Sequence, residues 1–536
     1  MRYVLSPLFQ KFAATTAGIA SVFLSLPVSA ADPWHVDGMP PGARSEQPSL
    51  TLVSPVEGID LESAGSTEID LLTTLRWSFS INEPETRRTE MERNWYVRHP
   101  EYLDRVFKRG QRYLPHIIDE LERRDLPMEL ALLPIVESAF DPFAYSHGRA
   151  AGLWQMIPGT ARRFGIEQNW WFDGRRDIVE STRAALDYLE YLYKFNEGDW
   201  LRAIASYNSG EGNVRRAVRN NRKVGKPIDF WNLKLPRETS MYVPKLLALV
   251  EIVSDPGKYG ITLPTIVDTQ QFDIVDIGSQ LDLALAAGLA GVDVDTIYAY
   301  NPAYNRWSTD PKGPHRLVLP IDVVETFTAA LAEVPKQERV RWKRHKVGNG
   351  ETISEIAIDY HTTAAEIRSA NNLRGNTIRA GHYLLIPVAS KPLSAYSKSA
   401  DSRLEANQNR QRDGSRVEHI VANGESFWTI SRQYKVSTRQ LAKWNNMAPG
   451  DTLPVGRKLV VWTDVEPMPR TSPTQLGNMT RKLNYTVRNG DSLYTIARRF
   501  RVGIDQIARW NSLNKNKILR PGQKLTIYAD VTRQSS

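Results

Sequence analysis

The chain of 536 residues contains no cysteine, and this absence excludes several classes of protein at once. A disulfide framework, a cysteine nucleophile and a thiolate metal site are all ruled out. The acylated cysteine of a lipoprotein is missing too, so we expect a protein that is not a cysteine-linked lipoprotein. With 41% hydrophobic residues, the composition is that of a globular protein whose domains are held together by apolar cores.

Long hydrophobic runs are scarce as well. The main run covers residues 13–26 and is followed by Val28-x-Ala30, which has the small-x-small form of a signal peptidase site. The run is shorter than the roughly 20 apolar residues that a membrane span needs. The pattern predicts a signal peptide over residues 1–30 and export to the periplasm or cell envelope.

Runs of five or six like charges are also absent, although the net charge is +9 and the isoelectric point is near 9.4. A basic chain fits nucleic acid, anionic lipid or an anionic polymer as its partner. Since export argues against nucleic acid, we expect an anionic wall as the partner, with peripheral association with the outer membrane as a further possibility.

The length is several times that of one domain, and shifts in composition mark the joints. Long apolar patterns with helical spacing alternate with polar stretches typical of linkers. The predicted parts are a signal peptide (1–30), a leader (31–90), a mainly helical domain (91–260), a connector (261–342), three small modules (343–388, 417–462 and 483–528), two linkers (389–416 and 463–482) and a tail (529–536).

The three small modules are copies of one repeat. Each opens with an Asn-Gly pair, and another asparagine follows 22 residues after the asparagine of that pair. These positions are Asn349 and Asn371, Asn423 and Asn445, and Asn489 and Asn511. Two stretches with helical spacing and a closing apolar strand complete each copy, so we predict the order strand, helix, helix, strand. The repeat resembles the lysin motif (LysM), which binds glycans that contain N-acetylglucosamine, such as peptidoglycan and chitin.

Residues 261–342 have two interpretations. Aligning Asn301 with Asn511 superposes four apolar positions and places a closing strand at 317–321, which favours a degenerate LysM copy. No Asn-Gly pair opens this segment, however, and a helical connector with the same apolar period fits it equally well. A degenerate copy is expected to pack against its neighbours rather than bind glycan.

The chemistry is expected between residues 90 and 260. Glu137 follows an apolar run at 132–136, so its carboxyl is expected at the end of a mostly buried helix. Burial disfavours the charged form, and the acid of a glycosidic reaction must be protonated near neutral pH. Close by, residues 148–152 are mostly small, which lets the backbone approach a sugar. Trp154 is predicted to stack on a pyranose and Gln155 to hydrogen-bond an acetamido or hydroxyl group.

Taken together, the motifs at 137–142, 152–161, 205–210 and 237–243 resemble those of the lytic transglycosylases. The resemblance implies a multidomain chain in which a mainly α, lysozyme-like catalytic domain precedes three small α+β LysM modules. It implies that Glu137 acts alone, first as acid and then as base, and that cleavage between N-acetylmuramic acid and N-acetylglucosamine closes a 1,6-anhydro ring. No metal or cofactor is implied. With Trp154, the predicted substrate-binding residues are Ser146, Gln155, Tyr207, Asn208, Glu238 and Tyr242.

Two other functions remain open at this point. A muramidase of the same fold would let water attack the intermediate, and a non-catalytic scaffold would use only its LysM modules. Most glycosidases need two carboxylates. The acids near Glu137 in the sequence are predicted to be turn or helix-start residues, namely Asp141, Asp173, Asp177 and Glu180. Well-known members of the family carry a lipidated cysteine, so we expect this chain to be held at the wall by its modules instead.

Overall fold

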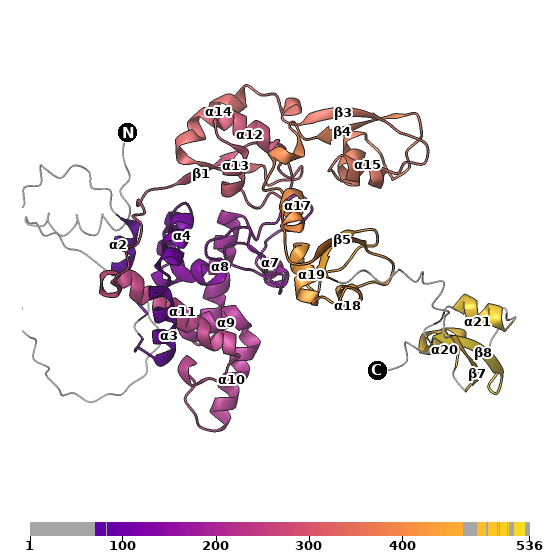
Figure 1. Ribbon diagram of the computed structural model, residues 1–536, viewed down its shortest axis with the longest axis horizontal. Helices are drawn as coiled ribbons and strands as arrows, with labels where there is room; N and C mark the ends of the chain where they lie inside the picture. The colour runs from indigo at the N-terminus through magenta and orange to yellow at the C-terminus, as the bar shows by residue number, and fades with distance from the viewer. Residues whose placement is uncertain are drawn as a thin grey trace, which may run out of the picture. The chain divides into compact units, whose positions relative to one another are not determined.

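The computed structural model describes residues 70–81, 83–464, 480–488, 491–500, 502, 504–511, 513 and 519–530. The predicted signal peptide, the leader up to residue 69, residues 465–479 of the second linker and the third Asn-Gly pair lie outside these ranges. Figure 1 colours the described elements in chain order, from indigo to yellow.

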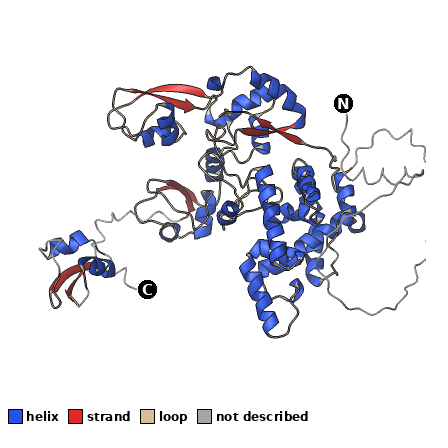
Figure 2. Ribbon diagram, turned by 180° about the vertical axis from the view of Figure 1, so that it is seen from behind, coloured by secondary structure: helices blue, strands red, loops and turns tan. Residues whose placement is uncertain are grey.

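Residues 71–259 form a helical region, which contains no paired β-strand among its described residues (Figures 1 and 2). The mainly α character predicted for the first domain is therefore confirmed. Its helices are α2 (Leu71–Trp77), α3 (Arg87–Val97), α4 (Pro100–Gly110), α5 (Leu114–Arg123), α6 (Leu133–Ser138), α7 (Pro158–Arg163), α8 (Ile178–Phe195), α9 (Trp200–Ser209), α10 (Glu211–Lys223) and α11 (Arg237–Ser254), with 3-10 turns at Met128–Leu132, Phe230–Asn232 and Gly257–Tyr259.

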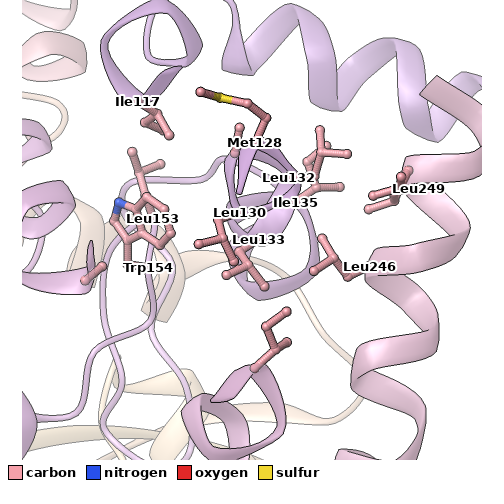
Figure 3. Close-up of a cluster of buried hydrophobic side chains, with 14 of the residues drawn as sticks. Ile117, Met128, Leu130, Leu132, Leu133, Ile135, Leu153, Trp154, Leu246 and Leu249 are labelled. Carbon is pink, nitrogen blue, oxygen red and sulfur yellow. The ribbon is translucent and has the colours of Figure 1, made fainter. Parts of the chain in front are cut away.

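The core of this region is built around the 3-10 turn at Met128–Leu132 and the short helix α6. Leu130, Leu132 and Leu133 are completely buried there. Leu246 and Leu249 of α11 belong to the same apolar cluster, which Figure 3 shows in close-up. Full burial of one such side chain contributes about 1.5–3 kcal/mol. The helix that carries Glu137 therefore has a rigid base.

Residues 272–332 form β1 (Phe272–Asp276), α12 (Leu283–Ala290), α13 (Val294–Tyr300), β2 (Arg316–Pro320) and α14 (Val324–Ala332). The two strands pair antiparallel, with Ile274 opposite Val318. This is the strand, helix, helix, strand order of a module and not that of a helical connector. Among the described residues no single helix has the length and apolarity to cross a membrane, and only the bent pair α12 and α13 meets those criteria jointly.

The three modules have the same order, and in each the two strands form an antiparallel pair. The first consists of β3 (Arg341–Lys346), α15 (Ile353–Asp359), α16 (Ala364–Ala370) and β4 (Tyr383–Val388). The second consists of β5 (Ser415–Ile420), α18 (Phe427–Gln433), α19 (Thr438–Trp444) and β6 (Lys458–Thr463), and the third of β7 (Thr480–Thr486), α20 (Leu493–Phe500), α21 (Ile504–Trp510) and β8 (Lys524–Asp530). The predicted α+β modules are therefore present.

The repeated asparagine joins the second helix of each module to its closing strand. In the second module, Asn445 donates to the carbonyls of Leu441 and Val460 and accepts from the N–H of Val460. The same three hydrogen bonds are made by Asn371, Asn511 and Asn301 in their own units. The equivalence of Asn301 and Asn511 thus has a structural basis.

The first predicted linker is ordered, which differs from the expectation of a flexible connection. It contains a 3-10 turn at Leu393–Ala395 and helix α17 (Ala400–Asn409). Tyr396 is completely buried in the apolar core of residues 272–332, and its hydroxyl donates to the carboxylate of Asp282. The composition did not reveal this anchor, because it is a single aromatic side chain within a polar stretch.

Candidate active site

The position of Glu137 is fixed by the way in which α6 ends. Ala139 and Phe140 both have left-handed backbone conformations, with φ of 51° and 55°, and their N–H groups return to carbonyls earlier in α6. Such conformations are uncommon for residues other than glycine. Phe140 is completely buried against Gly110, where an added Cβ would lie 2.7 Å from the Phe140 ring. This packing holds the turn directly after Glu137.

The loop at residues 144–156 lies beside the end of α6. Ser138 ties the two together, because its hydroxyl donates to the carbonyl of Leu153 at 2.8 Å. Within the loop, Gly152 has φ of 83°, and a Cβ there would come within 1.9 Å of the carbonyl oxygen of Arg175. Only glycine fits this position.

Ser146 and Gln155 stabilise the conformation of this loop through hydrogen bonds within it. The Ser146 hydroxyl accepts hydrogen bonds from the N–H groups of Gly148 and Ala150, at 3.2 and 3.0 Å. The Gln155 side chain donates to the carbonyl of Gly152 at 2.8 Å, and its backbone is left-handed, with φ of 46°. Both residues also line the cavity that contains Glu137.

Trp154 does not face the cavity, which corrects the prediction that it stacks on a sugar ring. Its side chain is completely buried in the apolar core (Figure 3), and its indole N–H donates to the Thr182 hydroxyl at 3.0 Å. The left-handed conformation at Gln155 turns the chain so that neighbouring side chains point in different directions. Trp154 therefore supports the loop from behind, through burial of its large ring.

Two further predicted residues come from the end of α9. The Tyr207 hydroxyl donates to the carbonyl of Trp154 at 2.8 Å, and so links α9 to the loop. Asn208 accepts a hydrogen bond from the Thr239 hydroxyl at 2.9 Å, which links α9 to α11. Tyr207 and Asn208 both line the same cavity as Glu137.

Helix α11 supplies the groups that act directly on the catalytic candidate. The Tyr242 hydroxyl donates a hydrogen bond to Oε1 of Glu137. Glu238, one turn earlier on the same face of α11, also lines the cavity. Lys245 continues this face one turn later and was not predicted. Its spacing of three and seven residues from Tyr242 and Glu238 is the signal that would have found it.

The cavity that these residues share has a volume of about 770 Å³. It is lined by the predicted residues Glu137, Ser146, Gln155, Tyr207, Asn208, Glu238 and Tyr242 and by others that the sequence did not indicate, including His147, Thr160, Tyr188, Glu211 and Lys245. Seven of the eight predicted site residues therefore meet in one place, although they lie on three segments distant in sequence.

The environment of Glu137 changes its acidity. Burial raises the pKa of this carboxyl to about 7; the hydrogen bond from Tyr242 opposes the rise, and the negative charge of Glu238 adds to it. Burial also raises the pKa values of Tyr207 and Tyr242 well above the ordinary value, so both phenols stay neutral donors. Glu137 is thus a buried carboxyl that changes charge near neutral pH.

The other acids named from the sequence do not line this cavity. Asp141 accepts from the N–H of Phe143 in a turn, and Asp177 caps the start of α8, as predicted. Asp173 does not start a helix, since α8 begins at Ile178. It forms a buried ion pair with Arg175 at 2.8 Å instead. Glu180 pairs with Arg183.

Family models match most of the chain outside its first 115 residues. The transglycosylase SLT domain matches residues 116–230, the LysM-like domain of lytic transglycosylase MltD matches 271–336, and the LysM domain matches 345–387, 419–462 and 485–527. The second of these matches covers the unit that contains Asn301.

Curated relatives agree with these matches. The chain is 34% identical over 457 residues to membrane-bound lytic murein transglycosylase D of Escherichia coli K12, covering 84% of this chain and 85% of that protein. Over 122 residues it is 49% identical to a putative tributyltin chloride resistance protein of Alteromonas sp. M-1, covering 23% of this chain and 59% of that protein.

Among solved structures, the lytic transglycosylase Slt of Pseudomonas aeruginosa is 25% identical, covers 28% of this chain and 25% of its own, and has a TM-score of 0.21. The matches in sequence span both the helical region and the modules. The chain therefore belongs to the family of membrane-bound lytic murein transglycosylase D, as a lytic transglycosylase with peptidoglycan-binding LysM modules.

Proposed function

We propose that Glu137 is the catalytic acid and base of this lytic transglycosylase. The observation that carries the proposal is a carboxyl with a pKa of about 7 at the wall of a large cavity. A group with this pKa is partly protonated and partly ionised at neutral pH, so it can both give and take a proton.

The reaction uses these two forms in turn. Protonated Glu137 gives its proton to the oxygen that bridges N-acetylmuramic acid and N-acetylglucosamine. The bond from the muramoyl C1 to that oxygen breaks, and its electron pair stays with the leaving sugar. The carboxylate then takes the proton of the muramoyl 6-hydroxyl, whose oxygen bonds to C1. Glu137 ends the cycle protonated, as it began, and no water is consumed.

Tyr242 and Glu238 act on the reaction through Glu137. The hydrogen bond from Tyr242 fixes one carboxylate oxygen, which leaves the other oxygen for the substrate. Glu238 raises the proton affinity of Glu137 by its negative charge. Tyr242 therefore positions the catalytic group, and both residues set the pH at which it works.

We propose that Ser146, Gln155, Tyr207 and Asn208 form the wall of the saccharide groove. Each lines the cavity, and each is held by a hydrogen bond within the helical region. A wall that is organised before the substrate arrives loses little entropy when the glycan binds.

Mass analysis of the products tests the role of Glu137. Peptidoglycan digested with residues 31–536 is expected to yield fragments ending in 1,6-anhydromuramic acid, one water lighter than reducing-end fragments. The Glu137→Gln variant is expected to yield none, because the amide has no proton of suitable acidity to give. Reducing ends instead would show that water attacks and that the enzyme is a muramidase, while full activity of the variant would remove Glu137 from the mechanism.

We further propose that residues 1–30 are a signal peptide, that the mature protein works in the periplasm, and that it associates peripherally with the outer membrane. The apolar run at 13–26 and the small-x-small site support export. N-terminal sequencing of the protein from a periplasmic fraction is expected to begin at Ala31. A chain that retains Met1 in that fraction would contradict the cleavage site.

A further inference from the structure

The sheet of the first module has an outer face that combines aromatic and basic side chains. In the antiparallel register, Trp342 lies opposite Pro387, Arg344 opposite Leu385 and Lys346 opposite Tyr383. Opposite residues point to the same side of a two-stranded sheet, and alternate residues point to the other side. These six residues therefore form one surface, which we call the β3–β4 outer face.

The outer face is open to solvent to a degree that is unusual for large apolar side chains. Trp342 is 44% exposed, Tyr383 51% and Leu385 47%. The neighbouring core face of the same strands behaves differently, because Leu384 and Ile386 are buried in the apolar core of the module. The exposed side chains are therefore not needed to hold the module together.

The charge on this face is all of one sign. Its charged residues are Arg344 and Lys346, and neither β3 nor β4 contains an acidic residue. Within the described part of the chain, neither of these two cations forms an ion pair with a carboxylate. The Arg344 guanidinium instead lies 4.0 Å from the centre of the Tyr383 ring.

The second module has the same fold but a different outer face. By register, Glu418 stands where Arg344 stands, and it pairs with Arg416 at 3.0 Å and with Lys458 at 2.9 Å. Val460, the counterpart of Leu385, is completely buried. In the second copy the two cations share the carboxylate of Glu418 and Val460 is buried, whereas in the first copy the cations of this face have no carboxylate partner and Leu385 is exposed. This difference indicates that the first module uses this face for binding.

We infer that the β3–β4 outer face is a docking surface for an anionic phospholipid bilayer. Exposed Trp and Tyr side chains favour the boundary between lipid headgroups and acyl chains, and nearby Lys and Arg side chains are attracted to anionic headgroups. This inference deepens the peripheral membrane association proposed above and names the surface that makes the contact.

Two other occupants fit the face less well. A sugar platform needs an open aromatic face and side chains that hydrogen-bond hydroxyl groups, whereas Arg344 covers the Tyr383 ring and the face has no Asp, Glu, Asn or Gln. A second copy of the chain would bring two basic faces together, and their repulsion disfavours that contact.

Vesicle flotation with residues 31–536 tests the inference. Binding is expected to vesicles of phosphatidylethanolamine with phosphatidylglycerol, to be much weaker with phosphatidylcholine alone, and to fall as salt is raised. Arg344→Glu, which copies the charge found in the second module, is expected to weaken binding about tenfold or more. Trp342→Ser is expected to weaken it severalfold, whereas Lys443→Glu, the same charge change at an exposed site of the second module, leaves binding nearly unchanged.

Equal vesicle binding by wild type, Arg344→Glu and Trp342→Ser would overturn the inference, as would no binding by the wild type. Loss of binding to lipid-free peptidoglycan sacculi in both variants would make the face a glycan platform instead. Release of 1,6-anhydro products from isolated sacculi is expected to continue in both variants. If the wild type releases no 1,6-anhydro products, the proposed function of Glu137 is contradicted, whereas the inference about this surface is not affected.

Discussion

The hydroxyl of Tyr242 on α11 donates a hydrogen bond to the carboxylate of Glu137 on α6, across 105 residues of sequence. This contact stabilises the ionised form of a carboxyl that burial otherwise keeps protonated. The two effects together place its pKa near the pH at which it has to work, so changes to either one are expected to move the pH dependence of the enzyme in a known direction.

Replacing Tyr242 by phenylalanine is expected to move the alkaline limb of kcat/KM to higher pH. In the proposed mechanism protonated Glu137 starts the reaction, so activity is expected to fall as pH rises through its pKa of about 7. Loss of a hydrogen bond to the ionised form raises that pKa, by about one unit or more. The pH profile on soluble glycan measures the shift. Tyr188→Phe is the matched control. The Tyr188 hydroxyl donates to Glu211 and not to Glu137, so its removal is expected to leave the alkaline limb in place.

Replacing Glu238 by glutamine is expected to move the same limb to lower pH. The negative charge of Glu238 disfavours ionisation of Glu137, so its removal lowers the Glu137 pKa. The shift is expected to be smaller than about one unit, since the groups interact through a solvent-filled cavity. A limb that moves upward would contradict this electrostatic role, whereas lower kcat/KM with an unmoved limb would indicate a role in substrate binding only.

Glu137 is also expected to reduce the stability of the fold at alkaline pH. Its pKa rises from 4.5 in the unfolded chain to about 7 in the folded protein. The folded state holds its proton more tightly, so the free energy of unfolding falls as pH rises from about 4.5 to about 7. The Glu137→Gln variant escapes this loss. It is expected to be more stable than wild type at pH 8, by at most about 3 kcal/mol, and equally stable at pH 4.

Urea unfolding at the two pH values checks this difference. The comparison is informative because the amide has nearly the shape of the protonated acid, so pH 4 provides an internal control. A variant that is less stable than wild type at both values would show that Glu137 contributes to folding through its contacts rather than opposing it through its charge.

The modules and the position of Glu137 at the end of a buried helix could be predicted from the sequence because their signals are local. The Asn-Gly pairs and the asparagines that follow them repeat at fixed spacing, and the structure shows that each described asparagine of the second set binds its closing strand. Glu137 follows a continuous apolar run. Patterns of this kind depend on a few neighbouring residues, so they can be recognised before the fold is known.

The features that the sequence did not predict correctly involve residues whose role depends on distant parts of the chain. Trp154 and Gln155 are neighbours, yet the left-handed backbone at Gln155 leaves one side chain in the core and the other at the cavity. Tyr396 is the one aromatic anchor of a polar segment, and its partner Asp282 lies 114 residues away. Local composition reveals neither the direction in which a side chain points nor a partner that is distant in the sequence.

Replacing Asn445 by alanine is expected to loosen the second module specifically. The substitution leaves the N–H and carbonyl of Val460 without their side-chain partner inside a buried region. Each unsatisfied buried group costs about 1–3 kcal/mol. Hydrogen exchange of residues 31–536, read by mass spectrometry, is expected to show faster exchange in α19 and β6 and unchanged exchange in the helical region. Lys443→Ala, an exposed change in the same helix, is the control.

The place at which the chain is truncated is expected to decide whether the catalytic part stays stable. Removing residues 343–536 takes away Tyr396, which fills the core of residues 272–332 and binds Asp282. Removing residues 413–536 keeps it. Because loss of a large buried side chain costs about 3–5 kcal/mol, the shorter protein is expected to melt several degrees lower than the longer one.

Both truncated proteins lose modules, and so both are expected to bind sacculi more weakly than residues 31–536, since linked modules raise the effective concentration at the glycan. Turnover on short soluble glycans is expected to persist in the protein that ends at residue 412, because every predicted residue of the cavity lies before residue 246. Equal melting temperatures for the two truncated proteins would show that the packing of Tyr396 in the core of residues 272–332 adds no stability.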